Sequence, residues 1–434
     1  MRPRAVVVGA GFAGVAAARR LAGAPVDTLV VDKRNFHLFT PLLYQVASSL
    51  LAPSEIAQPV RAILRGVPGA EFRMAEVLGV DLRARMLATD RGPLPYDYLI
   101  LAAGSVNDHF GLEGVARGSF NLKDMESALE LRNRVLSVFE SARWTADGEA
   151  RRRLLTFTVI GGGPTGIEYA GALGELVGLV LRRDFRELDV SEVSIELIEA
   201  SDHLLDAFLP GLREAARHHL ETKGIRLRLG TSVKSLRGDD LELAGGTTIP
   251  AGTVVWAAGV RAAPLGATLA VPIGHGGAVE VLPTLQLRGR PEVFVAGDMA
   301  AVGSAGGQLP MLATVAIQEG QHAAAGVRAL ATGAAVADFS FRDPGIMATI
   351  GRNAAVVQTR RLRLTGRLGW LAWLAVHLVR ILTLRSRAVV LINWAWNYVV
   401  FDRPVRLILR ASGGGRPPAG DRPGIGGDDE TRPR

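Results

Sequence analysis

The stretch AVVVGAGFAG, residues Ala5–Gly14, decides the fold of this chain. Its first four residues are apolar and predict a short buried strand, and Gly9, Gly11 and Gly14 follow with the spacing G-x-G-x-x-G where a helix is predicted to begin. The first glycine permits a tight turn, the second lets a pyrophosphate approach the backbone, and the third lets the helix pack close to the strand. The N–H groups and dipole of such a helix start favour phosphate.

A second apolar strand, Thr28–Val31, ends at Asp32, where an acidic residue is expected to bind a ribose hydroxyl. The pattern then recurs in TVIGGGPTG, which supplies Gly161, Gly163 and Gly166, and a following strand ends at Glu199. We therefore predict two dinucleotide-binding halves. The alternative, a glycine-rich turn that binds nothing, explains neither the flanking strands nor the acids.

Two further apolar strands, 98–104 and 254–259, both close on Ala-Ala-Gly, which strengthens the case for a repeat. The second half also carries a polar loop, predicted over 182–192, that lengthens its path to the acid. The segment EVFVAGDMA, 292–300, predicts a strand that presents Asp298 to a ligand hydroxyl, or else an ordinary Asp before a turn. A helix is predicted over 310–324, with its N-terminus facing the same ligand.

Composition excludes several function classes. The chain has no cysteine, so disulfide-relay flavoenzymes, flavin-dependent sulfide oxidisers and thiolate metal sites are excluded. Its eight histidines show no spacing with acids that predicts a metal site, and His37 is predicted to be structural. The net charge is +8, but the arginines are dispersed, so we expect no nucleic-acid partner. The apolar run near the N-terminus breaks at Gly9 and does not predict a signal peptide.

Between the halves, residues 119–143 predict an amphipathic helix with Asn121 or Asp124 as its cap, and 146–153 predict an exposed connection. The amino-acid composition changes after residue 338. Residues 360–410 hold ten Arg, one Asp and four of the six tryptophans, and the stretches 368–379 and 388–401 are uncharged but too short to span a bilayer. They predict an interfacial anchor on anionic lipid. The alternative is a helical hairpin buried in the core or in a dimer interface.

We call each predicted glycine loop, together with its helix start and its acid, a cradle. Two cradles in one chain indicate that one half binds a flavin and the other binds a nicotinamide cofactor. Glu199 favours NADH, because a carboxylate repels a 2′-phosphate. Without cysteine and beside a membrane, a quinone is the natural electron acceptor.

The chain resembles the type II NADH dehydrogenases, the non-pumping NADH:quinone oxidoreductases, from about Pro3 to Leu409. The resemblance is carried by RNFHLFTPLLYQVA, GGGPTGIEYAG, VVWAAGV, VFVAGDMA, LPMLATVAIQEG, AWLAVHL and LINWAWNYVVF. It implies a set of site residues: FAD at Gly9, Gly11, Gly14, Asp32, Asp298 and Ala316; NADH at Gly161, Gly163, Gly166 and Glu199; catalysis by Glu168 and Gln318; and quinone at Thr314, Gln318 and Glu319. The family commonly has Gln where this chain has Thr314, which is a departure at the quinone headgroup.

The expected fold class is therefore α/β, with two Rossmann-like domains and a C-terminal membrane-associating helical region. We expect an FAD domain at 1–120 with 282–335, an NADH domain at 121–281, a C-terminal domain at 336–410, and a disordered tail at 411–434. The expected activity is electron transfer from NADH to ubiquinone or menaquinone at the cytoplasmic face of the cell membrane, with a homodimer as an additional partner. The alternatives are a soluble-acceptor NADH:flavin oxidoreductase and a flavin-binding redox sensor.

Overall fold

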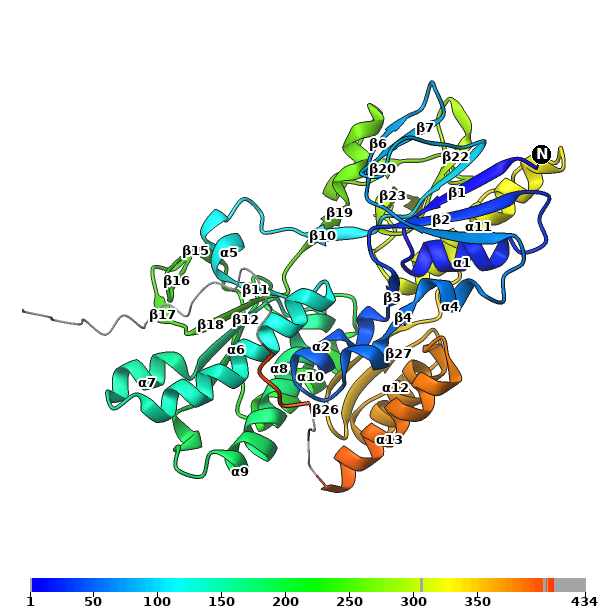
Figure 1. Cartoon of the computed structure of the whole chain (residues 1–434). Coiled ribbons are helices and arrows are strands. Elements are labelled where there is room, and N and C mark those ends of the chain that lie inside the picture. Colours follow the sequence, from blue (N-terminus) through cyan, green and yellow to red (C-terminus); the bar gives the residue numbers. More distant parts are fainter. Residues whose placement is uncertain (1, 305–306, 401–402, 404, 410–434) are drawn as a thin grey trace, which may run out of the picture.

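In the computed structural model of this chain, residues 2–304, 307–400, 403 and 405–409 are described. The predicted tail at 411–434 lies outside them. The apolar run of the opening motif forms β1 (Arg4–Val8), which lies inside a six-stranded sheet of order β21-β22-β9-β1-β2-β5 (Figure 1). The other strands are parallel to it except for β21, and their bounds are β2 (Asp27–Asp32), β5 (Ala70–Met74), β9 (Tyr98–Leu101), β21 (Gln286–Leu287) and β22 (Arg290–Val295).

The central strands β1, β2 and β9 are almost entirely buried because they are mostly apolar, whereas the edge strand β5 is largely exposed. One face is covered by α1 (Phe12–Arg20) and α11 (Ala313–Ala331), which lie side by side (Figure 1). They pack closely since Gly320 faces the Ala13 carbonyl oxygen, which an added Cβ would approach to 2.1 Å. The same core includes residues of an antiparallel sheet formed by β6 (Val77–Asp81), β7 (Met86–Thr89) and β8 (Leu94–Pro95).

The second glycine motif follows β12 (Thr156–Ile160) in a five-stranded parallel sheet of order β11-β18-β12-β13-β14. Its remaining strands are β11 (Phe120–Asn121), β13 (Ser194–Ile198), β14 (Arg226–Arg228) and β18 (Thr253–Trp256). The helices of this half are α6 (Met125–Trp144), α7 (Gly148–Leu154), α8 (Pro164–Glu175), α9 (Arg182–Asp184) and α10 (Pro210–Thr222), and an antiparallel sheet joins β15 (Val233–Arg237), β16 (Asp240–Leu243) and β17 (Thr248–Pro250).

Three expectations about this half need correction. The predicted helix begins at Met125, because Asp124 caps it by accepting a hydrogen bond from the Ser127 amide at 2.8 Å. The residues before it join the sheet as β11. The connection predicted over 146–153 is helical in its second part, where Asp147 caps α7. The polar loop predicted over 182–192 likewise contains a helical turn at each end, α9 and a 3-10 turn at Val190–Glu192.

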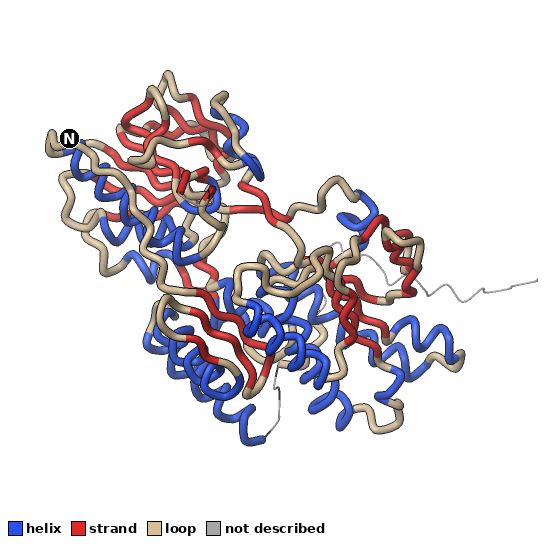
Figure 2. Tube along the Cα trace, turned by 180° about the vertical axis from the view of Figure 1, so that it is seen from behind, coloured by secondary structure: helices blue, strands red, loops and turns tan. Residues whose placement is uncertain are grey.

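An antiparallel ribbon joins the two halves. The two strands that end on Ala-Ala-Gly, β9 and β18, continue into β10 (Ser105–Asn107) and β19 (Val260–Ala262), which pair with each other. Figure 2 shows the halves as two bodies with this ribbon between them. The segments that follow the equivalent strands β9 and β18 therefore meet between the two halves.

The C-terminal region packs against the second half. It consists of the antiparallel strands β26 (Ile346–Gly351), β27 (Ala354–Gln358) and β28 (Arg363–Leu364), covered by α12 (Gly366–Arg380) and α13 (Leu384–Val400) (Figure 1). Gly171 of α8 permits the contact with β26, since an added Cβ would lie 2.5 Å from the Ile350 carbonyl oxygen. Within the described residues, no helix is both long and apolar enough to cross a membrane.

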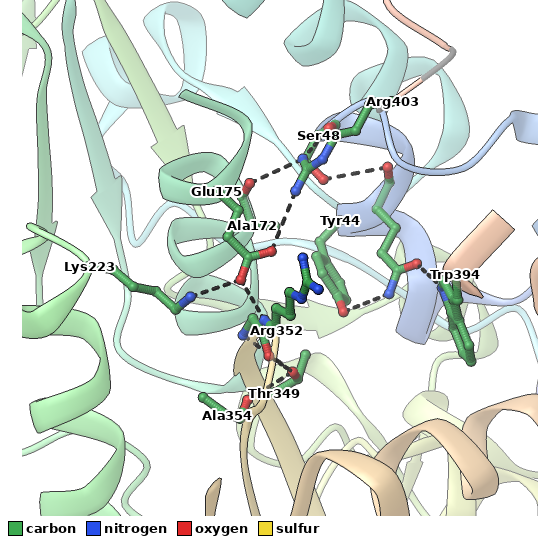
Figure 3. Close-up of polar contacts among 12 residues, drawn as sticks. Tyr44, Ser48, Ala172, Glu175, Lys223, Thr349, Arg352, Ala354, Trp394 and Arg403 are labelled. Atoms are coloured by element: carbon green, nitrogen blue, oxygen red, sulfur yellow. Dashed lines mark hydrogen bonds and ion pairs between the residues drawn. The ribbon is translucent and has the colours of Figure 1, made fainter. Parts of the chain in front are cut away.

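After α13, the chain is fastened back to the second half by a buried arginine (Figure 3). The Arg403 guanidinium donates to the carbonyl oxygens of Ser48, at 2.6 Å, and Ala172, at 3.2 Å, and lies 3.6 Å from the Glu175 carboxylate. Burial lowers the pKa of Arg403 to about 10. The Glu175 carboxylate also accepts from Lys223 at 2.8 Å.

Shorter elements complete the fold. They are β3 (Phe36–Leu38), α2 (Leu43–Ala47), α3 (Pro53–Ile56), β4 (Ala57–Pro59), α4 (Val60–Leu64), α5 (Glu113–Gly118), β20 (Val279–Glu280), β23 (Ala300–Ala301), β24 (Gly303–Ser304) and β25 (Gly307–Gln308). The two sheets bear out the α/β class. The predicted domain limits stay a prediction, because strand order does not define independently folding units.

Candidate active site

The first glycine loop has tight contacts at its ends and open space in its middle. Gly9 has φ +101°, and an added Cβ would lie 2.2 Å from the Ala102 carbonyl oxygen. At Gly14 the Cβ would lie 1.8 Å from the Gly9 carbonyl oxygen, whereas at Gly11 nothing lies within 4 Å. Gly11 is also the N-cap of α1, which has no side-chain cap. The backbone is therefore shaped to leave room for a ligand beside free helix N–H groups.

The second loop repeats this geometry residue by residue. Gly161 has φ +113° and lies against Ala257, and a Cβ at Gly166 would lie 1.9 Å from the Gly161 carbonyl oxygen. Gly163, the N-cap of α8, has nothing within 4 Å of its added Cβ. The same three roles in the same order make each loop fit a pyrophosphate.

The two predicted acids hold equivalent positions. The Asp32 carboxylate accepts from the Ala10 amide at 2.6 Å, and the Glu199 carboxylate accepts from the Gly162 amide at 2.5 Å. Each thereby holds the second residue of its glycine loop. A carboxylate has about four lone-pair sites, so both acids retain capacity to accept ribose hydroxyls.

A cavity of about 2590 Å³ extends from the second glycine loop to α12. Of the predicted residues, it is lined by Gly161, Gly163, Glu168, Glu199, Thr314 and Gln318. The other predicted residues do not line it: Gly9, Gly11, Gly14, Asp32, Gly166, Asp298, Ala316 and Glu319. The first half instead borders the cavity through residues around Phe12 and Ala16 of α1 and Thr40.

Asp298 lies at the carboxyl end of β22, as predicted, and joins a cluster that the sequence did not reveal. Ser105, at the start of the connecting ribbon, donates its hydroxyl to the Asp298 carboxylate. Lys123 donates to the Ser105 hydroxyl at 2.5 Å and lies 3.7 Å from Asp298. Lys123 also lines the cavity. In this cluster, the positively charged Lys123 side chain of the second half lies beside the strand end of the first half.

The first turns of α11 hold the predicted acceptor residues, but they face different ways. Thr314 and Gln318 line the cavity, and the Gln318 amide bonds the Arg342 backbone on both sides, at 2.9 Å and 3.0 Å. Glu319 is 1% exposed and accepts from the Gly297 amide at 2.6 Å. Burial raises the pKa of Glu319 to about 8, helped by the neighbouring Asp298. In this structure Glu319 holds the turn that presents Asp298.

Glu168, on the second turn of α8, is the predicted catalytic carboxyl and lines the cavity. Burial raises its pKa to about 8, although the Thr349 amide, which donates to it at 3.2 Å, opposes the shift. The carboxyl is therefore largely protonated at neutral pH. A neutral carboxylic acid at a cavity wall can donate a hydrogen bond or a proton.

Three further side chains line the same part of the cavity, and sequence reasoning did not single them out: Phe39, Tyr44 and His377. His377 stacks on Trp373, with ring centroids 4.0 Å apart, and one ring nitrogen bonds the Trp373 carbonyl oxygen. Burial lowers the pKa of His377 to about 4, so the ring is neutral. Tyr44 and His377 stand in segments that carried the resemblance, and that was the only signal for them. His37, predicted to be structural, is buried and bonds the Ala10 carbonyl oxygen at 2.8 Å.

Comparison with known proteins agrees with this geometry. Residues 3–320 match the model of the pyridine nucleotide-disulphide oxidoreductase family. The chain is 36% identical to the type II NADH:quinone oxidoreductase Ndh of Mycobacterium tuberculosis, over 92% of this chain and 88% of that protein. The chain belongs to the type II NADH:quinone oxidoreductases. It is thus an oxidoreductase with two dinucleotide-binding loops.

More distant proteins are similar in sequence or in fold. An internal alternative NAD(P)H-ubiquinone oxidoreductase of Arabidopsis thaliana is 29% identical over 94% of this chain and 86% of its own length. The structure of NDH2 from Plasmodium falciparum in complex with NADH superposes with a TM-score of 0.85 at 18% identity, covering 94% of this chain and all of that one. The sulfide:quinone oxidoreductase of Aquifex aeolicus superposes less closely, with a TM-score of 0.68 at 17% identity, covering 92% of this chain and 95% of that one.

Proposed function

We propose that this chain binds FAD in its first cradle and NADH in its second, and passes two electrons to a membrane quinone without pumping protons. The observation that carries the proposal is the matched pair of cradles, each with an open middle glycine and an acid at the next strand end. The names of the relatives, which include quinone and ubiquinone as acceptors, support the choice of acceptor.

The residues of this chain would bind and orient rather than react covalently. FAD, when bound, supplies the ring system that accepts and releases electrons. Glu199 favours NADH over NADPH by accepting a ribose hydroxyl. Glu168 holds a proton at its carboxyl near neutral pH and lines the cavity that the acceptor would enter. Thr314 and Gln318 stay candidates for the quinone headgroup, whereas the buried position of Glu319 favours a supporting role.

The outer side of the C-terminal helices supports docking on a membrane. We call this surface the apolar helix face: its large exposed side chains are Leu368, Leu371, Val379, Leu384, Leu391, Ile392, Trp396 and Val399. Arg367, Arg380 and Arg385 flank it in the sequence. Exposed apolar surface bordered by cations and carrying a tryptophan fits an anionic lipid interface. We place this interface at the cytoplasmic face of the cell membrane, and a second copy of the chain is the alternative cover.

The absorption spectrum of the purified protein tests the proposal. We expect flavin bands in the visible range, bleaching when NADH is added, and recovery when a short-chain quinone follows. A colourless protein, or a bound flavin that NADH leaves oxidised, would contradict it. A redox sensor would stop after one reduction of the flavin, and a soluble-acceptor reductase would recover with ferricyanide but not with quinone.

A further inference from the structure

A chain of hydrogen bonds runs from the last helix to the wall of the cavity (Figure 3). The indole N–H of Trp394, on α13, donates to the Gln45 side-chain oxygen at 2.8 Å. The Gln45 side-chain nitrogen donates in turn to the Tyr44 hydroxyl at 2.8 Å. All three side chains are buried, and Trp394 and Gln45 are 349 positions apart in the sequence. We call this chain of three residues the Trp394 relay.

The chemistry of the indole sets the direction of the relay. An indole nitrogen is a donor only, so Gln45 must turn its oxygen to Trp394 and its NH₂ group to Tyr44. The Tyr44 hydroxyl therefore accepts a hydrogen bond, and its own proton remains to be donated. Among the described residues, the only hydrogen bond found at the Tyr44 hydroxyl is the one from Gln45. A buried hydroxyl with an unused proton calls for an acceptor, because an unmade hydrogen bond is costly there.

Tyr44 borders the cavity at the end where Glu168 and His377 also line it. The ring of Tyr44 packs edge-on against Trp373, with centroids 6.4 Å apart. This packing and the relay restrict the orientation of the Tyr44 ring and of its hydroxyl. The site thus offers one hydroxyl proton and one buried carboxyl to a molecule that enters between α12 and α8. A dicarbonyl ring is the acceptor class that can use both.

We propose that Tyr44 donates a hydrogen bond to a carbonyl oxygen of the electron acceptor, and that Gln45 and Trp394 are positioning residues that keep its proton available. The inference rests on the proposed quinone reductase function and deepens it. It also links the acceptor site to α13, whose outer side is part of the apolar helix face. The seating of that helix then affects how the acceptor is held.

Two variants with matched controls test the relay in the full-length protein with its flavin. Tyr44→Phe removes the donated proton, and Trp394→Phe removes the start of the relay but keeps an aromatic ring. Tyr96→Phe is the control for a buried hydroxyl, since Tyr96 is buried in the first half and does not line the cavity. Trp144→Phe is the control for an indole, since Trp144 is 89% exposed on α6. The probes are a water-soluble ubiquinone analogue and ferricyanide, which has no carbonyl group.

For Tyr44→Phe we expect the KM for the quinone to rise about fivefold, the effect of one lost hydrogen bond, with flavin content and the ferricyanide rate unchanged. Trp394→Phe should raise the quinone KM in the same direction by a smaller factor, and both controls should match the unaltered protein. An unchanged quinone KM in Tyr44→Phe overturns the inference, and so does an equal loss with both acceptors, which would make Tyr44 merely structural. Failure of the unaltered protein to reduce the quinone at all would instead overturn the proposed function.

Discussion

At the scale of single residues, the site is governed by carboxyl groups in two kinds of surroundings. Asp32 and Glu199 lie at strand ends and accept hydrogen bonds from backbone amides. Glu168 and Glu319 are buried, and the pKa of each is raised to about 8. The sequence shows four acids of the same chemistry, and only the structure shows that two of them are buried.

Glu319→Gln should flatten the dependence of stability on pH. Because the folded pKa is about 8 and the unfolded value is 4.5, the folded protein keeps a proton that the unfolded chain releases between these values. The free energy of unfolding therefore falls as pH rises through this window, by on the order of a few kcal/mol for this group. We expect the Tm of the unaltered protein to fall more between pH 5 and pH 8 than that of the variant.

The control for this measurement is Glu113→Gln, which makes the same chemical change at a side chain that is 81% exposed. Glu168 remains in every variant and adds a decline of the same sign. If Glu319→Gln and Glu113→Gln lose the same Tm over the window, the Glu319 carboxyl does not hold its proton in the folded protein.

Glu199→Ala should narrow the preference for NADH over NADPH. The carboxylate would accept a hydrogen bond from the ribose hydroxyl of NADH and repel the 2′-phosphate of NADPH. Its removal should therefore weaken the binding of NADH and favour the binding of NADPH. We expect the ratio of the two kcat/KM values to fall about tenfold. Glu280→Ala, a substitution outside the cavity lining, is the control. A ratio that does not move would show that Glu199 only supports the glycine loop.

At the scale of elements, the glycine loops and their helices follow from local sequence, while helix ends depend on single caps. The start of α6 was placed too early because Phe120 and Asn121 pair with β18 instead. The helix α7 was missed because its burial is slight and its pattern is polar. The C-terminal helices do occupy the predicted stretches. Trp373 and Trp394 are buried while Leu368 and Ile392 are exposed, so a buried hairpin accounts for only one side of the pair.

Gly11→Ala should separate folding from ligand binding. Gly11 has φ −72° and nothing within 4 Å of an added Cβ, so alanine fits the ligand-free backbone without strain. The methyl group would occupy the space left for a pyrophosphate. We expect the ligand-free protein to unfold within about 0.5 kcal/mol of the unaltered one, and flavin content after purification to fall severalfold.

Gly163→Ala is the matched variant in the second loop, where the same space is open. It should leave flavin content intact and raise the KM for NADH. If Gly11→Ala instead raises the KM for NADH at full flavin content, the two cradles have been assigned the wrong way round.

At the scale of the whole molecule, the two halves bring repeated parts together from opposite sides. The Ala-Ala-Gly exits meet in the β10–β19 ribbon, and the C-terminal sheet rests on α8 through Gly171. The cavity between these parts borders residues from the first half, the second half and α12. The helix α12 contributes both to the apolar helix face and to the lining of the cavity.

The pair Leu391→Asn and Ile392→Asn should weaken membrane binding and leave the chemistry intact. Both side chains are more than half exposed, so polar replacements do not disturb the core, whereas truncation of the helices would remove the buried Trp373 and Trp394. We expect the double variant to lose most of its sedimentation with anionic liposomes and to keep its rate with ferricyanide. Unchanged sedimentation together with a loss of dimers would assign this face to a second copy of the chain.

By itself the sequence determined the parts of this protein that are local. A strand, three spaced glycines, a helix start and an acid lie within some thirty residues, so their chemistry is legible in order, and their repetition predicts the α/β fold. Tertiary structure alone decided the rest. The pKa of Glu168 depends on burial, which outweighs the hydrogen bond from the Thr349 amide. Glu319 turns away from the cavity to hold Gly297, and Tyr44 meets Trp394 through Gln45. Desolvation and hydrogen-bond direction come from neighbours 22, 181 and 349 positions away, and no pattern of spacing encodes them.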